Sequence, residues 1–195
     1  MERTEMELFA AFDGAIASTA EIVKGVRPGQ MSAPTPCTEW DLRGLLNHVI
    51  GTLWLSEALL TDQPPRHPMV PGGQPPTDLV GDDPAAAYAE ASAAALAAAG
   101  TGDALTRMHA TPLGDMPGPA LAGFTTLDLL VHGWDLAKAT GQPTDLDDKL
   151  AAHVLAFAEQ ALTSDTRAPR IGPTVAVPAD APLTDRLVGF LGRQP

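Results

Sequence analysis

Two segments carry metal-ligating side chains at spacings that suit a metal site. Asp128 and His132 lie four residues apart in the run Asp128-Leu-Leu-Val-His132, and His48 stands alone about eighty residues earlier. Residues i and i+4 share one helix face, so a helix here would present a carboxylate and an imidazole one turn apart. Two imidazoles and one carboxylate suit Zn, Ni or Fe(II) and leave coordination positions open for water or substrate. This pattern predicts an open metal site.

The same residues also fit plainer roles. A solitary histidine such as His48 is more often a surface residue or a satisfied core residue than a ligand. Asp128 and His132 could form a simple side-chain pair that contributes a few tenths of a kcal/mol. Asp135 lies on the same face of the expected helix, one turn beyond His132. The ends of this face look like core, for example at Phe124, one turn before Asp128. A buried carboxylate without a partner is costly, and metal coordination is one of the few arrangements that satisfies it.

The remaining ring and thiol side chains are expected to have structural roles. Three histidines are expected to be solvated: His67, His109 and His153. Three tryptophans are expected in core or rim packing: Trp40, Trp54 and Trp134. Cys37 precedes an expected helix start, where a thiolate would be favoured, but a small packed thiol is the expected role. As the only cysteine it cannot form an internal disulfide, which agrees with a reducing compartment.

The composition gives no reason to expect nucleic acid or membrane partners. The chain has 195 residues and a net charge of -12, with no Lys/Arg cluster to attract phosphate backbones or anionic lipids. The first residues lack the basic and apolar regions of a secretory signal, and no apolar run approaches the ~20 residues of a membrane span. We therefore expect a cytoplasmic protein with a single domain over residues 1–195. The oligomeric state stays open, with a homodimer among the alternatives.

The apolar periodicity predicts an all-α fold. Helices are expected over residues 5–26, 39–60, 84–99, 119–140, 146–162 and 183–191. Thr38 and Asp83 are expected to cap the starts of the second and third helices, and Gly141 to close the fourth. Prolines and glycines from Pro64 to Pro76 predict a long loop that could cover a cavity or lie uninvolved at the surface. A short strand or extended loop is expected over residues 106–111. These elements predict a helical bundle.

Three blocks of sequence resemble a known family. They are PTPCTEWD followed by LLNHV (residues 34–41 and 45–49), DLLVHGWDLA (128–137), and the weaker closing block VPADAPLTDRLVGFLGR (177–193). Together they resemble the mycothiol-dependent maleylpyruvate isomerase N-terminal family, within the wider DinB-like superfamily. The resemblance covers essentially the whole chain and is closest to actinobacterial single-domain members described only as metal-binding proteins.

This resemblance implies a fold and a ligand set. The implied fold is a DinB-like four-helix bundle with an extra short helix and an irregular C-terminal segment. One divalent metal would lie between the second and fourth long helices, and the family's ligand positions fall on His48, Asp128 and His132. The isomerase itself has glutamate at the position of Asp128, so aspartate shortens the reach by one methylene. The metal expected at these positions is zinc, with nickel or iron as the alternatives.

The resemblance also implies a reaction class. A low-molecular-weight thiol, mycothiol in an actinobacterium, would bind the metal, form a thiolate at neutral pH and attack a small electrophilic substrate. Asp135 is the candidate catalytic residue, because it could orient His132 or take up a proton, although a surface salt bridge is the alternative. The isomerase has a further C-terminal domain that this chain is too short to include, so maleylpyruvate isomerisation is not carried over.

We therefore expect a metal-dependent S-transferase or isomerase that uses a thiol. Two other functions remain open at this point. In the first, the site only stabilises the bundle or senses metal within a non-catalytic metal-binding or interaction domain. In the second, a metal-bound water replaces the thiol as the nucleophile, and the protein is a hydrolase.

Overall fold

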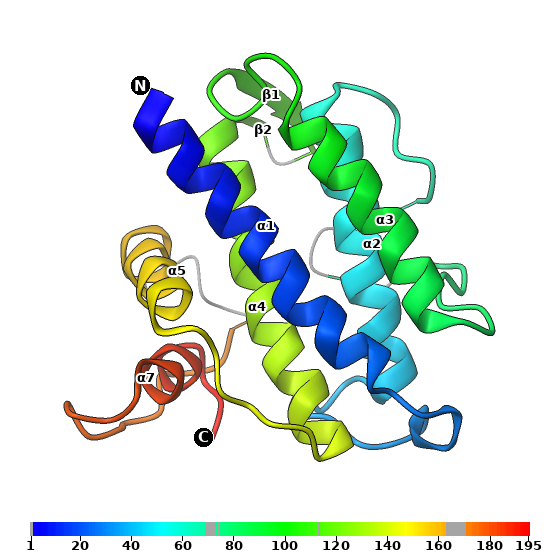
Figure 1. The fold of residues 1–195 in the computed structure, drawn as a ribbon, viewed down its shortest axis with the longest axis vertical. Coiled ribbons are helices and arrows are strands. Elements are labelled where there is room, and N and C mark those ends of the chain that lie inside the picture. Colours follow the sequence, from blue (N-terminus) through cyan, green and yellow to red (C-terminus); the bar gives the residue numbers. More distant parts are fainter. Residues whose placement is uncertain (1, 69–72, 74, 113, 163–170) are drawn as a thin grey trace. The chain divides into compact units, whose positions relative to one another are not determined.

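The computed structural model describes residues 2–68, 73, 75–112, 114–162 and 171–195, with side chains from residue 7 onward (Figure 1). Within these residues the chain forms six α-helices and one two-stranded hairpin, so it is mostly helical. No helix in this part combines the length and apolarity that a membrane span requires. The chain divides into two compact units, residues 1–143 and 144–195. The single domain over residues 1–195 stays a prediction.

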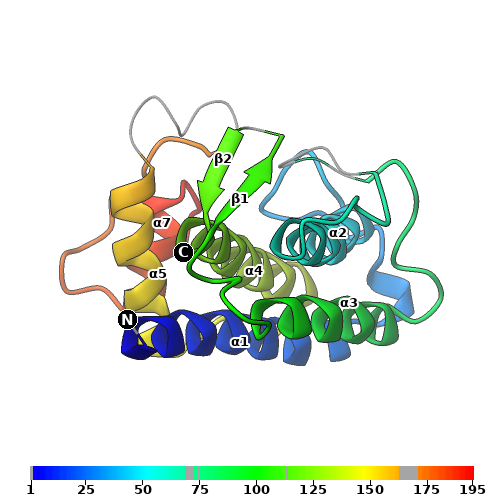
Figure 2. The same ribbon diagram turned by 90° about the horizontal axis from the view of Figure 1, so that it is seen from above.

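Four long helices build the first unit. They are α1 (Glu2–Lys24), α2 (Leu42–Leu60), α3 (Pro84–Ala99) and α4 (Gly118–Thr140), with a short 3-10 turn η1 (Pro28–Gln30) after α1. Helix α1 packs against α3 and α4, and α2 packs against the same two helices, so the four close into a bundle. Seen from above, α1 and α3 form one layer and α2 and α4 the other (Figure 2). The predicted helical bundle is therefore present in this unit.

The start of α2 differs from the prediction. Thr38 is not the cap, because Asp41 takes this role, its Oδ1 accepting a hydrogen bond from the Gly44 N–H at 2.9 Å. The residues before it form a turn closed by the Trp40 N–H, which donates to the Cys37 carbonyl at 2.8 Å. Both Thr38 and Asp41 are good capping residue types, and only the course of this turn decides between them.

Other helix ends and one close helix contact follow from residue type. Asp83 caps α3 and Gly141 closes α4 in the left-handed conformation with φ of +71°, both as predicted. Helices α1 and α4 approach closely at Gly133, where a Cβ would lie only 2.7 Å from Thr19 Oγ1. The Thr19 hydroxyl donates to the Leu129 carbonyl at 2.9 Å. Gly133 leaves space for Thr19, and the hydrogen bond then ties α1 to the middle of α4.

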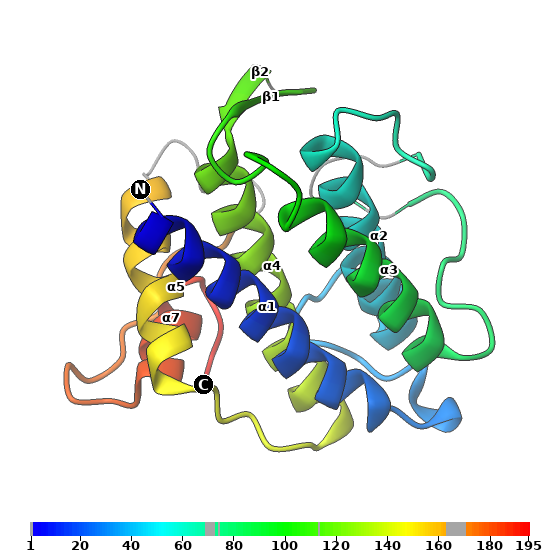
Figure 3. The same ribbon diagram turned by 45° about the horizontal axis from the view of Figure 1, so that its top comes forward.

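A hairpin of β1 (Met108–Thr111) and β2 (Gly114–Pro117) precedes α4. The strands pair antiparallel, and Figure 3 shows them at the end of the bundle where α4 begins. An extended segment was expected over residues 106–111, but the second strand was not, so the all-α prediction is wrong in this detail. Gly114 has a φ of +103°, which glycine alone adopts readily. Four residues containing a glycine and a proline give no alternating pattern from which a strand could be recognised.

The second unit contains α5 (Asp148–Ala161) and α7 (Leu183–Phe190), which pack against each other. Both helices were predicted, with boundaries one or two residues longer. Asp147 caps α5 by accepting from the Leu150 N–H at 2.9 Å. Residues 171–182 contain no helix or strand, in agreement with the predicted irregular C-terminal segment. They contact α7 through a hydrogen bond from the Val175 N–H to the Gly189 carbonyl.

Candidate metal site

Helices α2 and α4 bring the three predicted ligand residues together. His48 Nε2 lies 3.2 and 3.1 Å from the two carboxylate oxygens of Asp128, and His132 Nε2 lies 3.5 Å from one of them. The three possible ligand atoms all lie within 4.8 Å of one another. Residues from two distant segments therefore converge on one point of the bundle. Their role as metal ligands stays a prediction.

These distances and exposures fit a divalent metal. Bonds of roughly 2.0–2.2 Å from zinc to nitrogen and oxygen place neighbouring ligand atoms roughly 3.0–3.5 Å apart. His48 and His132 are 2% and 9% exposed, while 27% of the Asp128 side chain is exposed, so solvent reaches the carboxylate. Phe124, one turn before Asp128 on α4, is 36% exposed, so this end of the face is not the core that was expected. A metal held here would be accessible to a small molecule.

The outer nitrogen of His48 is held by a backbone carbonyl. His48 Nδ1 lies 3.0 Å from the carbonyl oxygen of Gly73. A carbonyl only accepts hydrogen bonds, so Nδ1 carries a proton, and a neutral ring then turns the Nε2 lone pair toward Asp128. Gly73 belongs to the loop from Pro64 to Pro76, of which residues 69–72 and 74 lie outside the described residues. The loop therefore reaches the site through one main-chain oxygen.

His132 is held from behind in the same way. Its Nδ1 lies 2.9 Å from Asp135 Oδ2, and Asp135 is fully buried. The Cys37 thiol also donates to this carboxylate oxygen, at 3.2 Å, and its sulfur lies 3.6 Å from His132 Nδ1. A carboxylate behind a histidine fixes the ring and its tautomer in many metal sites. Burial excludes the surface salt bridge considered for Asp135, and the catalytic role proposed for it stays a prediction.

If both rings were neutral, both imidazoles would present lone pairs to a carboxylate that also only accepts. Such a cluster needs a positive charge between its members, which either protons or a metal ion can supply. The Thr52 hydroxyl donates to Asp128 Oδ2 at 3.0 Å and fixes the carboxylate without adding charge. The donor set is therefore chemically suited to a divalent cation.

The pKa shifts of the metal-free site also reflect the need of this cluster for positive charge. Partial burial raises the pKa of Asp128, but the charges and hydrogen bonds of His48 and His132 outweigh it and hold that pKa well below its usual range. Burial lowers the pKa of His132, but Asp128, Asp135 and Cys37 together raise it well above the usual imidazole range. Without a metal, this site retains a proton on His132 near neutral pH.

Sequence reasoning missed the part played by the segment before α2. The Trp40 ring lies 4.6 Å from the His48 ring and 6.0 Å from the His132 ring, centroid to centroid. Trp40 is thus a packing residue, as predicted, but it packs against the site. The Thr35 hydroxyl lies 2.9 Å from the Cys37 carbonyl and 2.8 Å from the Trp40 carbonyl, which holds the segment in its turn. The available signal was the placement of Cys37 and Trp40 directly before the His48 helix.

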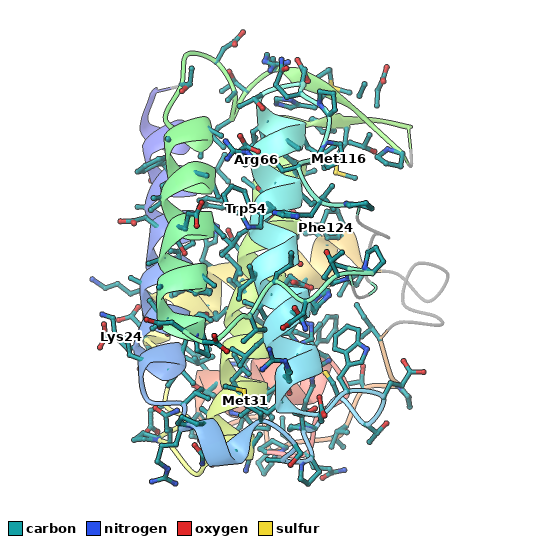
Figure 4. All side chains as sticks on the ribbon, turned by 90° about the vertical axis from the view of Figure 1, so that its right-hand side faces the viewer. Lys24, Met31, Trp54, Arg66, Met116 and Phe124 are labelled. Atoms are coloured by element: carbon teal, nitrogen blue, oxygen red, sulfur yellow. The ribbon has the colours of Figure 1, made fainter. Side chains whose placement is uncertain are left out.

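The three remaining histidines behave differently from one another. His109 is 1% exposed, so its predicted solvation is wrong. His153 is exposed on α5, as predicted. His67 is half-buried, with its ring centroid 5.8 Å from that of Trp54. Trp54 itself is 6% exposed and lies under the Arg66 guanidinium, 4.9 Å from the ring centroid (Figure 4), so its predicted packing role is confirmed.

Comparisons with known proteins agree with the resemblance seen in the sequence. Residues 12–137 match the mycothiol maleylpyruvate isomerase N-terminal domain, a range that includes His48, Asp128 and His132. Two curated relatives are the uncharacterized proteins MT0763 and Rv0738 from the CDC 1551 and H37Rv strains of Mycobacterium tuberculosis. Each is 33% identical over 195 residues, covering 96% of this chain and 98% of the relative. No solved structure matches the chain. The chain belongs to the mycothiol maleylpyruvate isomerase N-terminal domain family.

Proposed function

We propose that this protein is a cytoplasmic, divalent-metal-dependent enzyme in which a thiol, mycothiol, attacks a small electrophile in an S-transfer or isomerisation reaction. The observation that carries the proposal is the convergence of the His48 and His132 Nε2 atoms, both within 3.5 Å of one accessible carboxylate. The family match supports the choice of thiol. The first unit would accordingly be a DinB-like bundle, with its metal between α2 and α4.

His48 Nε2, His132 Nε2 and the Asp128 carboxylate would hold the metal, with zinc favoured and nickel or iron as alternatives. When bound, the metal would supply a positive charge that lowers the pKa of a coordinated thiol, so that its thiolate forms at neutral pH. Three protein ligands leave room for an added sulfur atom. The 27% exposure of the Asp128 side chain supports the entry of a small molecule at this position.

The surrounding residues orient these ligands. Asp135 accepts a hydrogen bond from the His132 Nδ1–H group and thereby keeps Nε2 available for a metal, while the Gly73 carbonyl accepts from the His48 Nδ1–H group. The Thr52 hydroxyl holds one oxygen of Asp128, and the Trp40 indole covers the His48 ring against water. Because Asp135 is fully buried, we assign it the positioning of His132 instead of direct contact with substrate.

Metal analysis tests the site itself. Protein purified without an affinity tag should contain about one equivalent of Zn, Ni or Fe, because three ligands converge on one point. His48→Ala and His132→Ala should lose most of this metal, whereas His153→Ala, on the exposed face of α5, should retain it. Equal metal content in all four proteins would rule out the site.

Ligand binding then separates the three candidate functions. Calorimetry should show heat on adding mycothiol to the metal-loaded protein and none after chelation. Absence of thiol binding, together with a large fall in melting temperature on metal removal, would favour a structural or sensing role. Turnover of an activated ester without any thiol would favour a hydrolase that uses metal-bound water.

A further inference from the structure

A second group of metal-ligating side chains lies behind His132, at the ring nitrogen that does not face Asp128. Cys37 Sγ lies 3.6 Å from His132 Nδ1 and 3.2 Å from Asp135 Oδ2, and the last two atoms are 2.9 Å apart. The segment before α2 supplies the sulfur, and α4 supplies the nitrogen and the oxygen from positions three residues apart. Three different ligand types therefore meet on the far side of the His132 ring.

The geometry of this group suits a metal ion with one sulfur ligand. Bonds of roughly 2.3 Å from zinc to sulfur and roughly 2.0–2.2 Å to nitrogen and oxygen place neighbouring ligand atoms roughly 3.2–3.6 Å apart. Both distances from the sulfur fall within this range. The distance from His132 Nδ1 to Asp135 Oδ2 is shorter because a hydrogen bond joins the two atoms. Cys37 lies in a turn, where the backbone adjusts to an ion more readily than a helix does.

Two protons hold this group together in the metal-free protein. The Cys37 thiol and the His132 Nδ1–H group both donate to Asp135 Oδ2. A divalent cation that displaced both protons would be bound by a thiolate, an imidazole nitrogen and a carboxylate. Two protons would leave as one dication enters, so the net charge around the fully buried Asp135 would not change. The exchange therefore adds no uncompensated charge to the interior of the bundle.

The shared ring makes binding on the two sides of His132 mutually exclusive. A neutral imidazole has one proton and one lone pair, so His132 can offer a metal either Nε2 or Nδ1. With the lone pair on Nδ1, the Nε2–H group lies 3.5 Å from Asp128 Oδ1 and faces an acceptor. The first unit would therefore hold one ion, either beside His48 and Asp128 or beside Cys37 and Asp135.

We propose that Cys37, His132 Nδ1 and Asp135 form a second site, which binds soft divalent cations and withdraws His132 from the first site. Ligand type decides which ion takes which place, because a thiolate favours softer ions than two imidazoles and a carboxylate do. The Cys37 side chain is partly exposed, so a cation can reach the sulfur from solvent. The proposal goes beyond the proposed function, since it requires neither a thiol cosubstrate nor a reaction.

Cadmium is the probe, because a cadmium-bound thiolate gives an ultraviolet charge-transfer band and the ligands of the first site include no sulfur. Cys37 is the only cysteine, so within one chain the band can have no other source. Cd²⁺ added to the chelated full chain should produce a band that saturates at about one equivalent. No band in the wild type would overturn the proposal. Saturation at half an equivalent would also overturn it, because two chains would then share one ion.

Three variants separate the two sites. Cys37→Ser keeps a donor for Asp135, so it should lose the band and bind Cd²⁺ more than about tenfold more weakly while retaining the wild-type zinc content. His48→Ala should lose zinc but keep the band, because His48 is not among the ligands on the Cys37 side. Thr38→Ser, at an exposed position in the same turn, is the matched control and should keep both. Loss of the band in His48→Ala would show that the sulfur belongs to the first site and would overturn the proposal.

Competition between the two ions tests the shared ring. When Cd²⁺ is added to zinc-loaded wild type, the band should grow in parallel with the zinc released to a chromophoric indicator. A full band with all zinc retained would overturn mutual exclusion, because both ions would then be bound at once. The wild-type spectra need no variant, so they decide the matter even if Cys37→Ser fails to fold. If the protein holds no zinc but the band appears in wild type and in His48→Ala, the second site stands although the proposed function fails.

Discussion

Two histidine and carboxylate clusters occur in the first unit, and they differ in how their charges are satisfied. In the candidate metal site, the described partners of Asp128 are two imidazoles and one hydroxyl. In the second cluster, near the hairpin, His109 Nδ1 lies 3.3 Å from Asp62 Oδ1 and Nε2 lies 2.6 Å from the Ala104 carbonyl. Arg107 is ion-paired with Asp62 and donates to the Leu60 carbonyl at 3.0 Å.

The permanent charge of Arg107 is the decisive difference. It holds the pKa of Asp62 below its usual value, first through its hydrogen bond, with smaller contributions from the hydrogen bond of His109 and from the charge of Arg107. The described partners of Asp128 include no arginine or lysine, so that carboxylate depends on protonated histidines or on a metal. A histidine beside a carboxylate is therefore a metal-site candidate only where the protein supplies no fixed cation of its own.

The largest expected effect is the loss of metal from the first cluster but not the second. His132→Ala should reduce the bound metal from about one equivalent to near zero, because two ligands with two open sides rarely hold a divalent ion. His109→Ala should keep the full equivalent. Metal analysis of both proteins after dialysis makes the comparison, and comparable loss in both would mean that the clusters are not distinct.

Asp135→Asn should give the next largest change. An amide in place of the carboxylate weakens the hold on His132 Nδ1, and loss of such an outer partner typically costs about 10–100-fold in metal affinity. Competition with a chromophoric chelator measures this affinity. The matched control is Asp62→Asn in the second cluster, which should leave metal affinity unchanged.

The sequence predicts which residues of this site share a helix face, but not how the helices that carry them cross. Asp128 and His132 share a face because their spacing matches the helical repeat, and α4 could be recognised from its apolar pattern and its closing glycine. His48 lies on an equally recognisable helix. What local pattern could not supply was the crossing of α2 and α4, which came only from the resemblance to the family.

The residues whose surroundings were not predicted from the sequence all lie in irregular segments or are covered by them. Cys37 and Trp40 reach the site through a turn held by the Thr35 hydroxyl, and no periodicity encodes the course of such a turn. His109 was expected in solvent, but pairing of β1 with β2 and the Ala104 carbonyl bury it. Burial of Asp135 depends likewise on how segments outside α4 pack over it. Helix faces were readable from sequence, whereas contacts made by turns were not.

Loss of His109 should lower the stability of the protein although it leaves the metal content unchanged. His109 is 1% exposed, so His109→Ala leaves a cavity and strips the buried Ala104 carbonyl of its donor, at a cost of about 2–3 kcal/mol in the free energy of unfolding. Urea denaturation of chelated wild-type and variant proteins measures this. An unchanged unfolding midpoint in His109→Ala would contradict the structural role given to His109.

The pH dependence of stability should change sign with metal. The raised pKa of His132 means that its contribution in metal-free protein is complete below the unfolded value of about 6.5 and is lost as pH rises through the folded pKa. The lowered pKa of Asp128 gives a contribution that is present above about 3.9 and lost as pH falls further. Metal binding requires deprotonated imidazoles, so metal-loaded protein should gain stability as pH rises through this range.

Melting temperatures from about pH 6 to pH 9, with and without chelator, test this sign change around the reference imidazole pKa. Chelated protein should lose stability with rising pH, and His132→Gln should flatten that slope. Parallel slopes with and without metal would show that the ion does not replace the protons of this cluster.

The smallest expected effect is that of Asp128→Glu, which gives this chain the carboxylate length of the isomerase that it resembles. Glutamate would still accept from Thr52 and face both imidazoles, but one added methylene must fit where His48 Nε2 already lies 3.1 Å from the carboxylate. Metal should remain at about one equivalent, with affinity changed by less than about tenfold. Chelator competition measures this change. Complete loss of metal would show that His48 and His132 are set for aspartate alone, and a large gain would show that the shorter side chain holds the ion under strain.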